Sequence, residues 1–111
     1  MFVRYDNCVT NSGWGLGFDL YKVIGLEFPT SRVGNAVTSP ATYNDNQWHH
    51  AVFVRNTAQM KDLIYVDGVL RAQLTFSTIH NLANTGSVLN FGSCATYQYY
   101  LGILDDIALI S

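Results

Sequence analysis

Short runs of alternating apolar and polar residues recur along the chain about every ten residues, separated by Gly, Asn, Asp and Thr. An apolar side chain at every second position is typical of a strand with one buried face. In residues 14–21 (WGLGFDLY), the side chains of Trp14, Leu16 and Phe18 alternate with glycines and an aspartate. Residues 48–56 (WHHAVFVRN) carry the strongest strand pattern, because β-branched and aromatic residues dominate them.

The whole pattern predicts eight or nine strands and no sustained helix, since no apolar stripe follows a helical period. Asp67-Gly68 suits the positive φ angles of a two-residue hairpin turn. Residues 77–84 are compatible with a single helical turn. The further expected strands are residues 23–28, 32–38, 63–67, 69–76, 87–92 and 99–110. The sequence therefore predicts one all-β domain over residues 1–111, an antiparallel β-sandwich.

Composition supports this fold class and excludes several functions. Charged residues make up 13% of the 111 residues, about half the usual share. Exposed helix faces favour Lys and Glu, but the chain has only two Lys and one Glu, so its composition also argues against helices. A formal net charge of −2 without a basic cluster argues against nucleic-acid binding. No apolar run approaches the ~20 residues of a membrane span.

The first residues lack the basic and apolar regions of a signal peptide. Met1 is thus either a natural start, which favours the cytoplasm, or the edge of a domain cut from a longer protein. In the second case the domain belongs outside the cell or on its surface.

Several segments, in this order, resemble the laminin G-like, concanavalin A-like lectin/glucanase jelly-roll family. Residues 46–55 (NQWHHAVFVR) are similar to its Trp-x-His strand, and residues 63–70 (LIYVDGVL) to its Tyr-Val-Asp-Gly hairpin. Residues 89–92 and 100–110 resemble its closing strands, and residues 12–16 (SGWGL) a common upstream segment. The resemblance implies a jelly-roll sandwich over almost the whole chain.

Most residues of these segments serve the fold. At the start of a strand, Trp48 is expected to anchor one sheet against the other with its large ring. As sequence neighbours on a strand, Asp105 and Asp106 are expected to face opposite sides, one of them capping loop amides. The residues expected to define the fold are Trp48, His50, Asp67, Gly68, Gly92, Gly102, Asp105 and Asp106.

Members of this family begin with two or three further strands that have no counterpart here. The resemblance therefore implies a sandwich that is incomplete at its N-terminal side. It would leave residues 103–110 as a bare apolar edge at Ile107 and Leu109, which soluble proteins avoid. A reduced sandwich, an oligomer across the edge, or a fragment of a longer chain would each resolve this. We expect a homo-oligomer.

The two cysteines, Cys8 and Cys94, lie far apart in sequence. They either close a disulfide in a secreted protein or remain free thiols in a reducing cell. Their spacing does not form a zinc-binding pattern.

Catalysis has weak candidates. Glycan-cleaving enzymes on this scaffold need two carboxylates about 5–9 Å apart. Glu27 is the sole Glu, and no second acid follows it two or four positions away. His49 and His50 are neighbours on one strand and would point to opposite faces, with His50 expected as a buried, hydrogen-bonded ring. We expect no enzyme.

Two loops carry candidate ligand-binding residues. Asn44, Asp45 and Asn46 offer closely spaced oxygen donors, which suit Ca²⁺ but equally a polar turn. No other cofactor is expected. Tyr97 and Tyr99 could stack on a sugar or lie at an interface.

Trp14 and His80 complete the candidate ligand-binding residues. The resemblance favours a non-catalytic module that binds a glycan or a glycosylated surface. The alternative is a structural or protein-interaction module that associates with itself through an open sheet edge.

Overall fold

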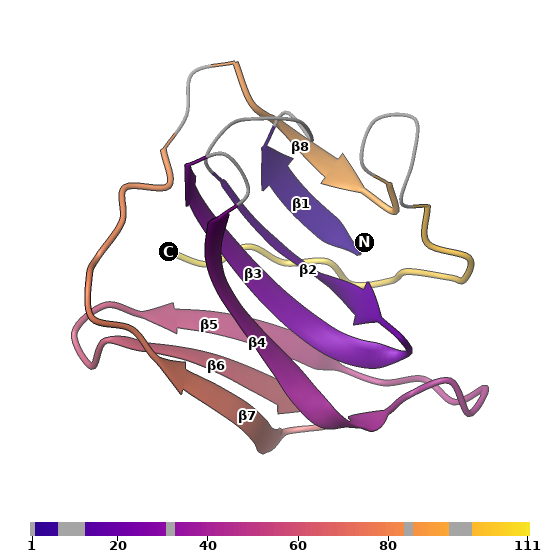
Figure 1. The fold of residues 1–111 in the computed structure, drawn as a ribbon. Coiled ribbons are helices and arrows are strands. Elements are labelled where there is room, and N and C mark those ends of the chain that lie inside the picture. The colour runs from indigo at the N-terminus through magenta and orange to yellow at the C-terminus, as the bar shows by residue number, and fades with distance from the viewer. Residues whose placement is uncertain (1, 7–12, 31–32, 84–85, 94–98) are drawn as a thin grey trace.

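A computed structural model describes residues 2–6, 13–30, 33–83, 86–93 and 99–111. In these residues eight strands form two antiparallel sheets that stack as a sandwich (Figure 1). The predicted all-β sandwich is confirmed, and no helix occurs in the described ranges. The strands are β1 (Val3–Asp6), β2 (Gly13–Asp19), β3 (Lys22–Thr30), β4 (Val33–Thr42), β5 (Ala51–Asn56), β6 (Lys61–Val66), β7 (Val69–Thr75) and β8 (Val88–Phe91).

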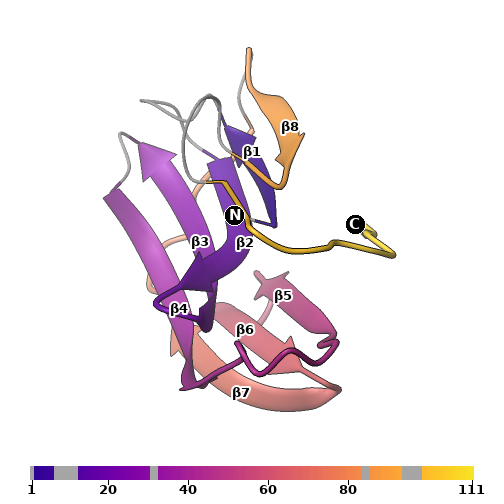
Figure 2. The same cartoon turned by 90° about the vertical axis from the view of Figure 1, so that its right-hand side faces the viewer.

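The two sheets differ in width. The larger sheet has the order β4-β3-β2-β1-β8, and the smaller has the order β5-β6-β7. The sheets meet mainly where β4 contacts β6 and β7 and where β3 contacts β6. Five strands thus face three, and β1 and β8 extend beyond the smaller sheet (Figure 2).

This mismatch divides the molecule into two parts. We call β3, β4, β6, β7 and the inward-facing side of β5 the closed half. We call β1, β8, the free edge of β5 and residues 99–111 the open half. In Figures 1 and 2 residues 99–111 cross the space between the larger sheet and β5. The strand β2 lies between the two halves.

The dry core lies in the closed half, where inward-facing residues of both sheets interlock. A Cβ atom on Gly25 would meet the ring of Phe53 from β5. The absence of a side chain at Gly25 therefore lets β5 pack close to β3. The core cluster consists of Val23, Val37, Ile64 and Val66.

Most predicted strands are confirmed. The hairpin between β6 and β7 turns at Asp67 and Gly68, whose φ angles are 55° and 76°. These positive values belong to the predicted two-residue turn. β4 is longer than predicted, and β5 starts only at Ala51. β1 was not predicted, because a strand of four residues carries little periodicity.

The predicted strand over residues 99–110 is wrong, because the described residues 99–111 contain none. An alternating apolar pattern becomes a strand only where a neighbouring edge supplies hydrogen bonds. Asp106 has a φ of 49°, which breaks the extended backbone, and its N–H donates to Asp105 Oδ1. Because the backbone is not extended there, Asp105 and Asp106 do not lie on opposite faces of a strand. Both are exposed.

Three smaller expectations are also corrected. Trp48 does not anchor the two sheets but is 68% exposed, because it lies in the loop before β5. His50 is exposed, and its neighbour His49 is the half-buried histidine. Residues 77–83 form no helical turn.

Two expected glycine positions occur in turns or close contacts. Gly92 has a φ of 72° directly after β8, and a Cβ atom on Gly102 would meet the ring of Tyr100. Cys8, Cys94 and Tyr97 lie outside the described residues.

Candidate functional site

The inner face of the open half is apolar and incompletely covered. In the sheet register Val3 of β1 lies opposite Leu16 and Phe91, and Tyr5 lies opposite Trp14 and Leu89. Directly opposite residues share a face, so this row continues the core face of β2. On β8 both members of the row are exposed. The smaller sheet provides no strand beneath them.

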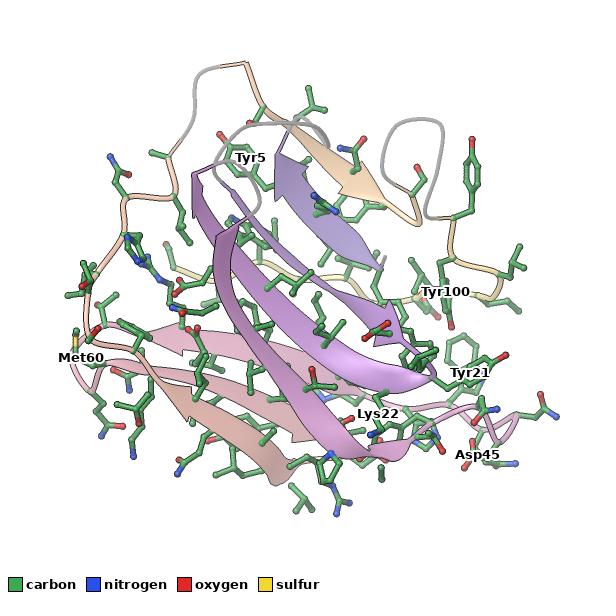
Figure 3. All side chains as sticks on the ribbon, in the orientation of Figure 1. Tyr5, Tyr21, Lys22, Asp45, Met60 and Tyr100 are labelled. Atoms are coloured by element: carbon green, nitrogen blue, oxygen red, sulfur yellow. The ribbon has the colours of Figure 1, made fainter. Side chains whose placement is uncertain are left out.

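The C-terminal segment, residues 99–111, fills part of this space. Its start is fixed, because Tyr100 N–H donates to the Gly92 carbonyl at 2.7 Å. The Tyr100 ring also packs edge-to-face on Phe2, at a centroid distance of 4.8 Å. Figure 3 labels Tyr100 near the start of the segment, close to Tyr21 in that view. Beyond it, Leu101 is 95% and Ile110 94% exposed.

Between the sheets the segment borders a cleft of 2330 Å³, which Phe18, Tyr43, Trp48 and Phe53 also line. Pockets for small molecules enclose about 300–1,000 Å³. The cleft is larger and open to solvent. It is therefore the uncovered edge of the hydrophobic core rather than a small-molecule pocket.

The closed half contains a buried polar cluster that bridges the two sheets. Glu27 of β3 is fully buried, and its Oε2 lies 2.6 Å from Nε of Arg55 on β5. The Asn35 side-chain amide donates to Glu27 Oε1 at 2.5 Å. Arg55 also donates from Nη2 to the His80 carbonyl at 2.6 Å. The cluster thus joins β3, β4, β5 and the segment after β7.

Asp62 of β6 is the second acid of this cluster. It is 1% exposed and lies opposite Arg55 in the strand register. Burial raises the pKa of Asp62 from 3.8 to about 7, and the Glu27 carboxylate adds to the rise, while the Arg55 charge opposes it. A carboxyl group with this pKa is largely protonated below neutral pH.

Sequence inspection near Glu27 missed Asp62, because the two acids meet only when the sheets stack. The available signal was the alternation in residues 61–66, which puts Asp62 on the same face as Ile64 and Val66. Two close carboxyl groups also occur in glycan-cleaving sites. Here both are buried, so neither has access to a substrate.

His49 holds together a second, exposed polar cluster. Its Nδ1 lies 2.8 Å from Asp67 Oδ2, and its Nε2 lies 2.9 Å from Asp45 Oδ1. Hydrogen bonds to Asp67 and Asp45, in that order, raise the pKa of His49. The same bonds lower the pKa of both aspartates. The cluster ties the loop before β5 to the β6–β7 hairpin.

The loop that was expected to bind Ca²⁺ is exposed at the end of the sandwich, near the Tyr21 turn (Figure 3). It consists of Asn44, Asp45 and Asn46. Asp45 Oδ1 accepts the Gln47 N–H at 3.1 Å as well as the bond from His49. Across the described residues no group of three His, Cys, Asp or Glu side chains could hold a metal ion. The carboxylates of Asp45 and Asp67 bond to different ring nitrogens of His49. Their oxygens therefore do not converge on one point where a cation could bind.

The residues expected to bind a ligand are not brought into one cluster by the described contacts. Tyr99 is exposed at the start of the C-terminal segment. Trp14 is half-buried and stacks on Tyr5 at 6.1 Å. His80 contributes its carbonyl to the Arg55 cluster.

The residues expected at the oligomer edge are apolar and solvent-accessible but belong to no sheet. Ile107 and Leu109 are 45% and 53% exposed. Both border the open cleft.

A comparison with protein families agrees with this architecture. A family model described as the concanavalin A-like lectin/glucanases superfamily, of the laminin G type, matches residues 2–111. The chain therefore belongs to this superfamily. No curated protein and no solved structure matches it. The described residues include no helix with the length and apolar character of a membrane span.

Proposed function

We propose that this member of the concanavalin A-like superfamily is a non-catalytic recognition module that binds polypeptide through its open half. The superfamily suggests a binding role. The observation that carries the proposal is the apolar inner face of β8, where Leu89 and Phe91 are exposed, whereas Val3 on the same face of β1 is buried. Such surfaces mark interaction sites in soluble proteins.

An extended polypeptide suits this surface better than a small molecule does. The cleft exceeds ordinary ligand pockets and is bordered by the free edge of β5. A peptide strand can bind there with backbone hydrogen bonds and alternate apolar side chains. The burial of Glu27 and Asp62 supports the absence of catalysis, since hydrolysis requires acids that reach substrate and water.

Glycan binding is the second candidate, and the exposure of Trp48 favours it. Trp48 is 68% exposed beside Asn46 and Gln47, which are exposed too. An aromatic face next to amides can stack on a sugar ring and bond its hydroxyls. In this reading, Ca²⁺ on the loop of Asn44, Asp45 and Asn46 would add a further contact.

Display of random twelve-residue peptides, alongside a glycan array with and without Ca²⁺, tests the proposal. We expect enrichment of peptides with alternating apolar residues and a blank array. Leu89→Lys should abolish peptide binding, because Leu89 lies on the inner face of β8. Val88→Lys is the matched control, one position away on the opposite face. Glycan binding that Trp48→Ala removes, without peptide enrichment, would overturn the proposal.

A further inference from the structure

The four sheet edges of the molecule are not equally protected against pairing with another strand. β4 carries Pro40 and two register shifts against β3, and it contacts β7. β7 has a register shift against β6 and the exposed Arg71. β8 has four residues. Bulges, proline, charge and shortness all discourage edge-to-edge association.

β5 has none of these features. Its six residues pair with β6 without a register shift, and it contains no proline. Its one charged side chain, Arg55, turns inward to Glu27. No described backbone hydrogen bond joins β5 to residues 99–111. All six β5 residues remain partly exposed, as expected for a strand with one uncovered side.

The solvent-accessible surface area of the chain is larger than its mass predicts. A folded monomer of 12.4 kDa is expected to expose about 6,100 Å². This chain exposes 6886 Å². The excess of roughly 800 Å² means that the chain is less compact than an average monomer of its mass, as an incompletely covered sandwich requires.

We propose that two copies of this chain pair through the free edges of their β5 strands, antiparallel, so that their three-stranded sheets become one continuous sheet. This inference rests on the proposed function, since it makes a second copy the polypeptide that the open half binds. A two-fold axis perpendicular to the sheet keeps the inner faces of both copies on one side.

The register of this pairing follows from the alternation of β5. Inner residues must oppose inner residues, and a pairing centred on Phe53 uses the most of the strand. Phe53 then faces its own copy, Val52 faces Val54, and Arg55 faces Ala51. Aromatic and β-branched pairs stabilise neighbouring strands, and no like charges meet.

The register makes a charge test possible. Val52 and Val54 alternate with the inward-facing Phe53 and Arg55, so charges there leave the core intact. Val52→Lys with Val54→Lys creates two symmetry-related lysine–lysine pairs across the dimer. Val52→Lys with Val54→Glu is the matched control, because each lysine then faces a glutamate.

Sedimentation equilibrium from about 1 µM to about 1 mM measures the association. We expect a dimer for the natural chain, at least ~10-fold weaker association for the double-lysine variant, and near-natural association for the lysine–glutamate variant. Equal association of the two variants would overturn the proposed register and edge. A natural chain that stays monomeric would also overturn the inference. Peptide binding by that monomer would leave the proposed function standing, whereas a monomer without peptide binding would overturn both.

Discussion

The two halves of this sandwich are built from similar strands but differ in what covers them. In the closed half, residues such as Val23, Ile64 and Val66 are at most 1% exposed. In the open half, Leu89 and Phe91 continue the same face of the larger sheet but lie in contact with solvent. Val3 of β1 is still buried, so the loss of cover is concentrated at β8, where apolar side chains of the same face remain in contact with solvent.

The comparison also separates stability from binding. The closed half holds the core and the Glu27–Arg55–Asp62 cluster, so it should account for most of the free energy of unfolding. We expect the open half to contribute little to the stability of the isolated chain, and we propose that its apolar surface binds a partner.

The largest expected effect comes from removing the cation of the buried cluster. Arg55→Met leaves the fully buried Glu27 carboxylate without its counter-charge. We expect a loss of about 3–5 kcal/mol in the free energy of unfolding, measured with urea. Arg71→Met, on the exposed face of β7, is the control and should change stability by less than ~0.5 kcal/mol. A loss below about 1 kcal/mol for Arg55→Met would show that the cluster does not stabilise the closed half.

The next largest effect is a pH dependence opposite to that of most carboxyl groups. The pKa of Asp62 is raised in the folded chain, from 3.8 to about 7. Its contribution to stability is therefore complete below about pH 4 and is lost as the pH rises to about 7. We expect the free energy of unfolding to fall by about 2–4 kcal/mol as the pH rises over this range.

This contribution is measured by urea unfolding of the natural chain and of the Asp62→Asn variant at several pH values. The amide cannot ionise, so the decline should disappear in the variant, while Asp19→Asn at the exposed end of β2 should retain it. A decline of equal size in Asp62→Asn would assign the pH dependence to other groups.

A smaller effect is expected where β5 packs on β3. Gly25→Ala adds a Cβ atom that collides with the Phe53 ring, so the ring must move. We expect a loss of about 1–3 kcal/mol. Phe53→Leu in the Gly25→Ala background should recover part of it, measured against Phe53→Leu alone. Fully additive losses would mean that the two residues do not press on each other.

These effects show what the sequence could and could not predict. The hairpin at Asp67 and Gly68 was readable because its turn chemistry is local. The meeting of Glu27 with Asp62 was not, because it depends on how two sheets stack. The C-terminal segment has a strand pattern but no strand, since its state depends on a neighbouring edge that the pattern does not contain.

The same limit applies to the candidate site. Trp48 resembles a core anchor by residue type, but a strand that begins three residues later leaves it in a loop. The His49 ring bonds to Asp67, whereas His50 donates only its backbone N–H to that carboxylate. The sequence around the two histidines does not indicate which of the two rings meets Asp67.

The smallest effect is expected in the C-terminal segment. Leu101→Ser and Ile110→Ser remove side chains that are almost fully exposed, so each should change the free energy of unfolding by less than ~0.5 kcal/mol. Ile64→Ala, on the fully buried side, should cost about 2–5 kcal/mol. Comparable losses at Leu101 and Ile64 would remove the distinction between the halves.

Native-state hydrogen exchange, followed residue by residue at low protein concentration, tests the difference between the halves most directly. We expect amides of β3 and β6 to exchange only through global unfolding. Amides of β8 and of residues 101–111 should exchange much faster, through local opening. Protection of residues 101–111 equal to that of β6 would contradict the account, because the open half would then be part of the cooperative core.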